Sequence, residues 1–309
     1  MRLQILSLQG ISKYYGKNRI LDGIDLEVHE GEIFVLLGSN GCGKSTLLRI
    51  MATLLRPDSG EALIFGSKGS PENLLHVGIM FDHTAHWDKL TGYENAWMFA
   101  RSYGLSGAQA ASKLDNLFKW IGIFERRNEA VATYSYGMRR KLSLIEALVH
   151  EPDLLLMDEP SMGLDYSSRL AIYSHLQSLA DNGMTIVLST NDVSEAELLA
   201  SRVALLKEGH IIALDRPEHL VASLNALTRI ELKLAVPISI ESIREIRGIE
   251  KVEVNGDRLR ILADSNNDSL SSVVKKVTML GGAIQKIEVK EPNLGDAFLK
   301  FSGENSDAA

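Results

Sequence analysis

The stretch GSNGCGKST, residues 38–46, decides the fold of this chain. An unbroken apolar run, IFVLL at 33–37, precedes it, and LLRIMATLL at 47–55 follows it with a helical pattern. The spacing G-x-x-x-x-G-K-[ST] between a strand and a helix is typical of a loop whose backbone N–H groups surround phosphate oxygens at the positive end of the helix. A glycine-rich turn without a ligand is the competing interpretation. The context favours an α/β core that binds a nucleoside triphosphate.

Each residue type in this loop has a chemical reason. Glycines leave the backbone free to curl around an anion. Lys44 would bring a compact positive charge to the β- and γ-phosphates, and Ser45 would offer its hydroxyl to Mg²⁺. We therefore predict that ATP is bound by Gly38, Ser39, Asn40, Gly41, Cys42, Gly43, Lys44, Ser45 and Thr46.

Cys42 is the only cysteine of the chain, which excludes an intrachain disulfide and fits a reducing compartment. Because it lies at a helix N-terminus, we expect its thiolate to be stabilised and its alkylation to block nucleotide binding. The alternative is an inert small side chain that fills space.

A second continuous apolar run, DLLLMD at 153–158, ends in two neighbouring carboxylates. Asp158, at the end of a buried strand, would hold Mg²⁺ directly or through water. Glu159 would accept the proton of the attacking water. A plain strand-end cap is the alternative, and the loop at 38–46 makes the catalytic interpretation the stronger one.

The segment YSYGM, residues 134–138, opens a helical stretch although it carries a glycine and two tyrosines. We expect Ser135 to cap this helix, so that its hydroxyl and the Gly137 N–H face outward at a second positive helix end. An ordinary capped helix would leave Tyr136 and Gly137 unexplained. One face of the helix is apolar and carries Met138, Leu142, Ile145 and Val149.

With the loop at 38–46, YSYGM, and LLLMDEPSMGLD at 154–165 in this order, the chain resembles the ATP-binding subunit of ABC transporters over roughly residues 1–220. YSYGM matches that family's signature loop, usually written LSGGQ. The resemblance implies that two subunits pack head to tail, with the signature loop of one covering the γ-phosphate bound by the other. It also implies that Tyr15 stacks on adenine, with Tyr14 or strand packing as competitors. Asp165 would contact the opposite subunit, or would simply start a helix.

Two positions depart from the family pattern. Asp82 in VGIMFDH (77–83) aligns with the glutamine that senses phosphate, and Asn191 after TIVLST (185–190) aligns with the switch histidine. Aspartate can ligate Mg²⁺ but is shorter than glutamine. An asparagine amide can donate one hydrogen bond but lacks the reach of an imidazole. We therefore expect an ABC-type ATPase that is slow; the alternative is an ATP-binding switch or regulatory subunit with little or no hydrolysis.

Composition limits the partners. The net charge of −7 and the pI of about 5.7 disfavour nucleic acid. No apolar stretch reaches the roughly 18 residues of a membrane span, and no secretory signal opens the chain. The resemblance implies a separate membrane permease, a second ATP-binding subunit that forms a homodimer, and a peripheral location on the cytoplasmic face of the cell membrane. A soluble ABC protein acting on ribosomes or DNA is the third class, and the single cassette without a coiled-coil insertion or basic tract argues against it.

The form YSxGM, the segment LTGYENAWMFARSYGL (90–105) and the segment EPNLGDAFLKFSGE (291–304) resemble ATPase subunits of exporters of drugs, antibiotics and polysaccharides. The cargo path of that family lies in the permease, so the sequence of this chain does not identify the cargo.

The predicted fold is a P-loop NTPase (RecA-like) α/β core at 1–220, with antiparallel β and helical subdomains. The alternation of Ile24, Leu26 and Val28 predicts an antiparallel strand. Residues 184–190 are predicted to form a third buried strand beside those at 33–37 and 153–158, and residues 202–215 a hairpin that turns at Glu208-Gly209. The helical subdomain spans about 84–150. It holds all three tryptophans, Trp87, Trp97 and Trp120, which we expect to fill its core. Lining a groove for permease helices is the alternative for Trp87, Tyr93 and Trp97.

Residues 221–309 are predicted to form a small C-terminal accessory domain. Strand patterns at 229–236, 251–254, 258–262 and 283–289, with helices near 240–246 and 269–280, follow the order β-α-β-β-α-β. That order is typical of a ferredoxin-like α+β fold. The resemblance implies a regulatory or dimer-stabilising role, and we expect the final residues, SGENSDAA, to be disordered.

Overall fold

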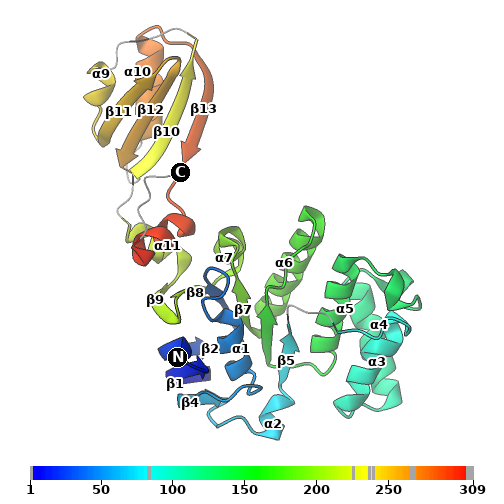
Figure 1. Cartoon of the computed structure of the whole chain (residues 1–309). Helices are drawn as coiled ribbons and strands as arrows, with labels where there is room; N and C mark the ends of the chain where they lie inside the picture. The colour runs from blue at the N-terminus through cyan, green and yellow to red at the C-terminus, as the bar shows by residue number, and fades with distance from the viewer. Residues whose placement is uncertain are drawn as a thin grey trace. The chain divides into compact units, whose positions relative to one another are not determined.

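The computed structural model describes residues 3–81, 85–224, 227–235, 238, 241–264 and 269–303. The chain divides into two compact units, Met1–Pro217 and Glu218–Ala309, each of which has its own sheets and helices (Figure 1). Asp82, one of the predicted site residues, lies outside the described residues.

The first unit is built on a six-stranded sheet with the order β5-β6-β7-β3-β8-β9. In that order the strands are Val77–Met80, Leu154–Asp158, Thr185–Thr190, Ile33–Leu37, Arg202–Lys207 and His210–Asp215. The first five are parallel, and β9 returns antiparallel to β8. Every residue of β3, β6 and β7 is buried, as the continuous apolar runs predict for strands covered on both faces. The predicted hairpin is also confirmed, with its turn at Glu208 and Gly209 in left-handed backbone.

Helices follow these strands and pack back on the sheet. Helix α1 (Lys44–Met51) lies against β6 and β7, and α7 (Val193–Leu199) against β3 and β7. Helix α6 (Tyr166–Asp181) packs on β7 and α7. Leu37 pairs with Thr190 and Asp158 with Ser189, so the carboxyl ends of β3, β6 and β7 meet at one edge of the sheet. Ligands of open α/β sheets bind at such an edge.

A separate antiparallel sheet, order β2-β1-β4, forms a second layer of the first unit. Its strands are Asn18–His29, Gln4–Tyr15 and Ser59–Ile64. The alternation seen at residues 24–28 is confirmed in β2, whose inward residues join the same apolar core as β3 and α1. The sequence analysis did not predict β1 or β4. A short helix, α2 (Pro71–Leu74), leads to β5.

The helical insertion contains α3 (Gly92–Ser102), α4 (Gly107–Trp120) and α5 (Tyr136–Leu148). Two 3-10 turns, Phe124–Arg126 and Val131–Thr133, join α4 to α5. Its fully buried positions are mostly small or aliphatic: Ala96, Ala100, Ala110, Leu114, Phe118, Leu142 and Ile145. The expectation that the tryptophans fill this core is wrong, because Trp87 is 50% exposed and Trp97 and Trp120 are only partly buried. Buried alanines on α3 and α4 leave no room for an indole between those helices, and Trp97 instead stacks on Tyr93 with ring centroids 5.9 Å apart.

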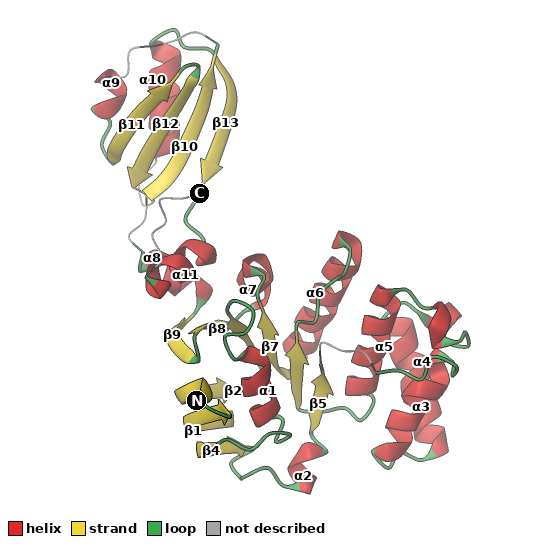
Figure 2. Cartoon of the chain, viewed as in Figure 1, coloured by secondary structure: helices red, strands yellow, loops and turns green. Residues whose placement is uncertain are grey.

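The second unit confirms the ferredoxin-like order. Its four antiparallel strands lie in the order β11-β12-β10-β13, namely Ile249–Asn255, Arg258–Asp264, Leu227–Leu234 and Ile284–Lys290. Helices α9 (Glu241–Arg244) and α10 (Ser269–Met279) cover one face of this sheet (Figure 2) and share its apolar core, which includes Ile230, Ile261 and Val273.

Two more helices flank these strands. Helix α8 (Pro217–Ala222) precedes them and α11 (Leu294–Ser302) follows them. Lys300 on α11 donates to the backbone carbonyl of Leu224, just after α8, at 2.9 Å. Residues 304–309 of the predicted disordered tail lie outside the described residues, and Ser302 is the last residue of α11.

Candidate functional site

The loop at 38–43 leaves β3 and curls tightly before α1. Gly38 donates its N–H to the carbonyl of Thr190 at 3.3 Å, and Gly43 holds φ at +113° as the N-cap of α1. A Cβ on Gly38 would lie 2.3 Å from the carbonyl oxygen of Leu206, and one on Gly43 would lie 2.7 Å from a methyl of Leu21. Only glycine fits at these positions, which is what a backbone that must wrap around an anion requires.

Lys44 is buried at the centre of this loop. Its Nζ donates to the carbonyls of Gly38 at 2.8 Å and Ser39 at 3.2 Å, and it lies 3.4 Å from Oε1 of Glu159. Ser45 and Thr46 follow on the first turn of α1, where Ser45 is partly exposed. The structure therefore brings the predicted lysine and the predicted general base together, although 115 positions separate 44 from 159 in the chain.

The two carboxylates after β6 have different surroundings. Asp158 is buried, and one oxygen accepts a hydrogen bond from the Ser189 hydroxyl. Its Oδ2 is buried and has no hydrogen-bond partner among the described residues. Glu159 has left-handed backbone, φ +48°, and donates its N–H to the carbonyl of Ser189 at 3.0 Å. Burial raises the pKa of the Glu159 carboxyl, and the Lys44 ammonium opposes that shift.

Asn191 joins this group from the end of β7. Its Nδ2 donates to Oδ1 of Asn40 in the loop at 3.0 Å. Its backbone N–H also faces the Glu159 carboxylate and lowers the pKa of that group. Asn191 is thus held against both the phosphate-binding loop and the second carboxylate.

Cys42 does not behave as expected. Its thiol is 5% exposed, and burial raises its pKa, while Lys44 opposes the shift. The expectation of a stabilised thiolate is wrong because the thiol is buried against Gly38, where a Cβ would lie 2.7 Å from Sγ, and this burial outweighs the opposing Lys44 charge. Desolvation there outweighs the positive end of α1.

The YSYGM segment starts α5 as predicted. Ser135 is exposed, is the N-cap residue, and accepts a hydrogen bond from the Met138 N–H at 3.2 Å. Leu142 and Ile145 are buried, as the predicted apolar face requires. A Cβ on Gly137 would lie 3.3 Å from the Ser168 hydroxyl at the start of α6.

Asp165 is the N-cap of α6. Its carboxylate accepts from the Ser168 N–H at 2.9 Å and from the hydroxyls of Ser167 and Ser168 at 2.7 and 2.8 Å. These bonds hold the pKa of Asp165 well below its usual range, with the Ser167 hydroxyl as the largest cause. The helix-starting interpretation is confirmed, and the contact with a second subunit stays a prediction. Tyr14 and Tyr15 are 44% and 48% exposed at the end of β1, so either ring is accessible for stacking.

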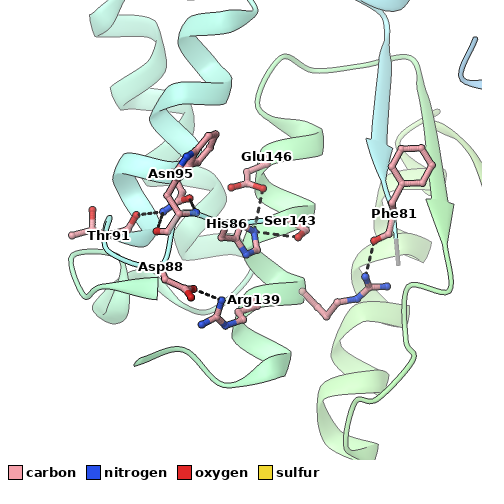
Figure 3. Close-up of polar contacts among 10 residues, drawn as sticks. Phe81, His86, Asp88, Thr91, Asn95, Arg139, Ser143 and Glu146 are labelled. Carbon is pink, nitrogen blue, oxygen red and sulfur yellow. Dashed lines mark hydrogen bonds and ion pairs between the residues drawn. The ribbon is translucent and has the colours of Figure 1, made fainter. Parts of the chain in front are cut away.

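The segment after β5 is fastened to α5 by an ion pair and by the hydrogen bonds of a buried histidine (Figure 3). Asp88 Oδ1 lies 2.6 Å from Nη1 of Arg139. His86 Nε2 lies 3.2 Å from Oε2 of Glu146 and 3.3 Å from the Ser143 hydroxyl. Both His86 and Glu146 are buried, and burial raises the pKa of the Glu146 carboxyl. The helix that begins at the YSYGM segment is therefore tied to His86 and Asp88, in the segment that follows β5.

Sequence reasoning missed two buried charged residues beside the site. Arg140 on α5 is fully buried and donates to backbone carbonyls after β5 and β6. Glu195 on α7 is fully buried, and burial raises its pKa to about 7. Both stand in short charged runs, RRK and SEAE, which look like solvent-facing helix positions. The only available signal was their closeness to YSYGM and to Asn191.

The described residues also bear on metal binding and on membrane spans. Among the described residues, no group of three or more His, Cys, Asp and Glu side chains could hold a metal ion. A magnesium site here would instead combine one carboxylate, a hydroxyl and phosphate oxygens. None of the helices in the described ranges is both long and apolar enough to cross a membrane.

Comparison with known proteins gives consistent matches. The family model for ABC transporter matches residues 21–162, a range that holds the phosphate-binding loop, YSYGM and both carboxylates. The daunorubicin resistance ATP-binding protein DrrA3 of Streptomyces coeruleorubidus is 32% identical over 305 residues, covering 97% of this chain and 96% of that protein. The Nod factor export ATP-binding protein I of Cupriavidus metallidurans (strain ATCC 43123 / DSM 2839 / NBRC 102507 / CH34) is 33% identical over 322 residues, covering 97% of each.

A solved structure of the ATP-binding subunit of an ABC transporter superposes with a TM-score of 0.65 at 26% identity, covering 71% of this chain and 93% of that one. The first unit is thus an ATP-binding cassette of the P-loop NTPase class. The chain belongs to the ABC transporter family, among its ATP-binding proteins.

Proposed function

We propose that this chain hydrolyses ATP as one of two identical subunits and thereby drives a separate membrane permease in an exporter. The convergence of Lys44, Glu159 and Asp158 at one sheet edge carries the proposal. A phosphate-binding cation, a candidate base and a candidate metal ligand thus come from two segments that meet, the start of α1 and the end of β6.

The residues present fit ATP and Mg²⁺. The amides of the glycine loop and the Lys44 ammonium would hold the triphosphate, and the unpartnered Oδ2 of Asp158 with the Ser45 hydroxyl would hold the metal. Bound Mg²⁺ would neutralise charge that develops on the phosphate oxygens. Asp82 would be a further ligand or sensor from the segment after β5.

Glu159 is the proposed general base. Its pKa is raised by burial, which suits a group that must accept a proton near neutral pH. The Lys44 ammonium, 3.4 Å from Oε1, partly opposes this rise in the pKa of Glu159. Asn191 would donate one hydrogen bond to the γ-phosphate, and with Asp82 and Asn191 replacing glutamine and histidine we expect slow turnover.

Dimerisation and location follow from the exposed loops and the relatives. Ser135, Gly137 and Asp165 would cover the nucleotide of a second copy, and Tyr15 would stack on its own adenine. Relatives named for daunorubicin resistance and Nod factor export favour an exporter of this general type. The protein would lie peripherally on the cytoplasmic face of the cell membrane through its permease, without a nucleic-acid partner. The accessory unit at 221–309 would regulate the dimer or stabilise it.

The test is phosphate release by the chain purified with its permease. Glu159→Gln should bind ATP normally but release phosphate about 10²-fold more slowly, because one general base is lost. Lys44→Ala should fail to bind ATP. Glu151→Gln is the matched control, since Glu151 also has left-handed backbone but its side chain is 73% exposed. Equal rates for the wild type and Glu159→Gln, with ATP-dependent dimerisation intact, would identify the non-hydrolysing switch instead.

A further inference from the structure

Among the described residues, Arg140 is the largest fully buried side chain, and it lies on α5, three positions after Gly137. Its guanidinium donates hydrogen bonds to the backbone carbonyls of Phe81, Asp158, Glu159 and Pro160. The bond to Phe81, marked in Figure 3, is 2.8 Å long, and those to Asp158 and Pro160 are each 3.3 Å long. One side chain therefore fastens the signature helix to the end of β5 and to the loop after β6.

Burying a guanidinium is costly unless its donors are all used. Three of its acceptors among the described residues, Asp158, Glu159 and Pro160, are consecutive, and Glu159 between the other two has left-handed backbone at φ +48°. A planar fork with five N–H donors can reach such a set, whereas the single ammonium of lysine cannot span it. The neighbouring Arg139 differs, because it is partly exposed and pairs with the Asp88 carboxylate at 2.6 Å.

We infer that Arg140 is a positioning residue that sets the place of the Glu159 carboxylate and couples it to the signature loop of the same subunit. This inference rests on the proposed function, in which Glu159 is the base. The guanidinium grips the backbone on both sides of the Glu159 side chain and at Glu159 itself. A shift of α5 therefore moves the base.

This connection has a consequence for the dimer. The signature loop of one subunit would cover the nucleotide bound by the other, while Glu159 serves the nucleotide bound by its own subunit. Closure of α5 on one nucleotide would thus adjust the base at the second nucleotide through Arg140. Hydrolysis at the two sites is cooperative by this route, and the coupling stays within one rigid contact rather than passing through the permease.

The experiment uses the full chain with its permease and measures kcat, KM and the Hill coefficient for ATP. Arg140→Lys should lower kcat by about 10- to 100-fold, since a small misplacement of a reacting group has effects of that size. KM should change less than about twofold and the Hill coefficient should fall to about one, because the hydrogen bonds described for Arg140 go to residues 81 and 158–160, outside the phosphate-binding loop. Arg139→Lys is the matched control on the same helix and should leave all three parameters unchanged.

A second variant separates positioning from folding. Arg140→Gly leaves a space shaped for guanidinium, so millimolar guanidinium should restore part of its kcat, whereas equal sodium chloride should not. Arg139→Gly should show no such rescue. Arg140→Lys that matches Arg139→Lys in kcat and Hill coefficient overturns the inference, as does a folded Arg140→Gly whose rate guanidinium does not raise.

A measurement on the unaltered protein covers the case in which the variants do not fold. Hydrogen exchange should show residues 135–138 and 159–161 gaining protection together on titration with a non-hydrolysable ATP analogue. Independent protection of the two segments contradicts the inference. A wild type that binds ATP but releases no phosphate would instead sink the proposed function, while this exchange result would still decide whether Arg140 couples the two segments.

Discussion

Replacement of Glu195 by glutamine should stabilise the protein at alkaline pH. Glu195 is fully buried on α7, and neither carboxylate oxygen has a hydrogen-bond partner among the described residues. The hydroxyls of Thr190 and Ser161 are near enough to favour the charged form, yet neither makes a hydrogen bond of normal geometry to it. Burial therefore dominates and raises the pKa of this carboxyl from 4.5 to about 7.

The sign and size of this effect on the free energy of unfolding follow from the linkage between proton binding and folding. Because the folded pKa lies above the unfolded value, the folded chain holds the proton more tightly, and the stability this gives is present below pH about 4.5 and lost as the pH rises through 7. The loss above pH 7 amounts to about 3 kcal/mol. Glu195→Gln is neutral at every pH, so it should exceed the wild type in unfolding free energy by up to about 3 kcal/mol at pH 8 and by less than about 1 kcal/mol at pH 5.

Urea unfolding followed by tryptophan fluorescence is the assay. All three tryptophans lie between residues 87 and 120, so the signal reports on the first unit alone. Glu197→Gln, on the same helix at an exposed position, is the matched control and should show no such pH dependence. The reasoning is refuted if Glu195→Gln is no more stable than the wild type at pH 8, or if the gap between them is the same at both pH values.

Two further predictions concern the phosphate-binding loop. Gly43→Ala puts a Cβ at φ +113° and 2.7 Å from Leu21, so it should cost about 1–3 kcal/mol of stability and abolish ATP binding. Gly41→Ala also has positive φ, but its Cβ meets no atom within 4 Å, so this variant should lose less stability. Equal melting temperatures for the two variants would contradict the steric argument. Cys42 should react with a maleimide far more slowly in the folded chain than in urea at pH 7, because burial raises its pKa and covers it, and equal labelling rates would show that the thiol is accessible.

Local spacing was enough to predict the parts of the site that depend on local backbone. The glycines at 38–43 and the buried strands β3 and β6 each appear as an unbroken stretch of sequence. This is because a loop around phosphate and a strand covered on both faces need specific residues at specific positions. Strand β1 escaped prediction since its pairing shifts register near Gly10, which breaks the alternation of buried and exposed side chains. Strand β5 has only four residues, too few for any period to show.

The burial of the charged residues Arg140 and Glu195 could not be predicted for a different reason. Arg140 is satisfied by carbonyls of residues 81 and 158–160, which are distant in sequence, so nothing around position 140 marks it as buried. Glu195 is likewise buried by strands and a loop that precede α7. The free-energy cost of burying a charged side chain depends on partners that only the tertiary structure supplies. Because short charged runs are normally solvated, the sequence around positions 140 and 195 predicts exposure.

The central position of β3 governs when the site can exist during synthesis. Its two neighbours in the sheet, β7 and β8, come from residues 185–207, whereas the loop it carries is finished by residue 46. A nascent chain that has emerged only as far as the second carboxylate contains residues 38–46, Asp158 and Glu159 but lacks Asn191 and both strands that flank β3. Closing such long loops is entropically slow. We therefore expect nucleotide binding only after nearly the whole first unit has been synthesised.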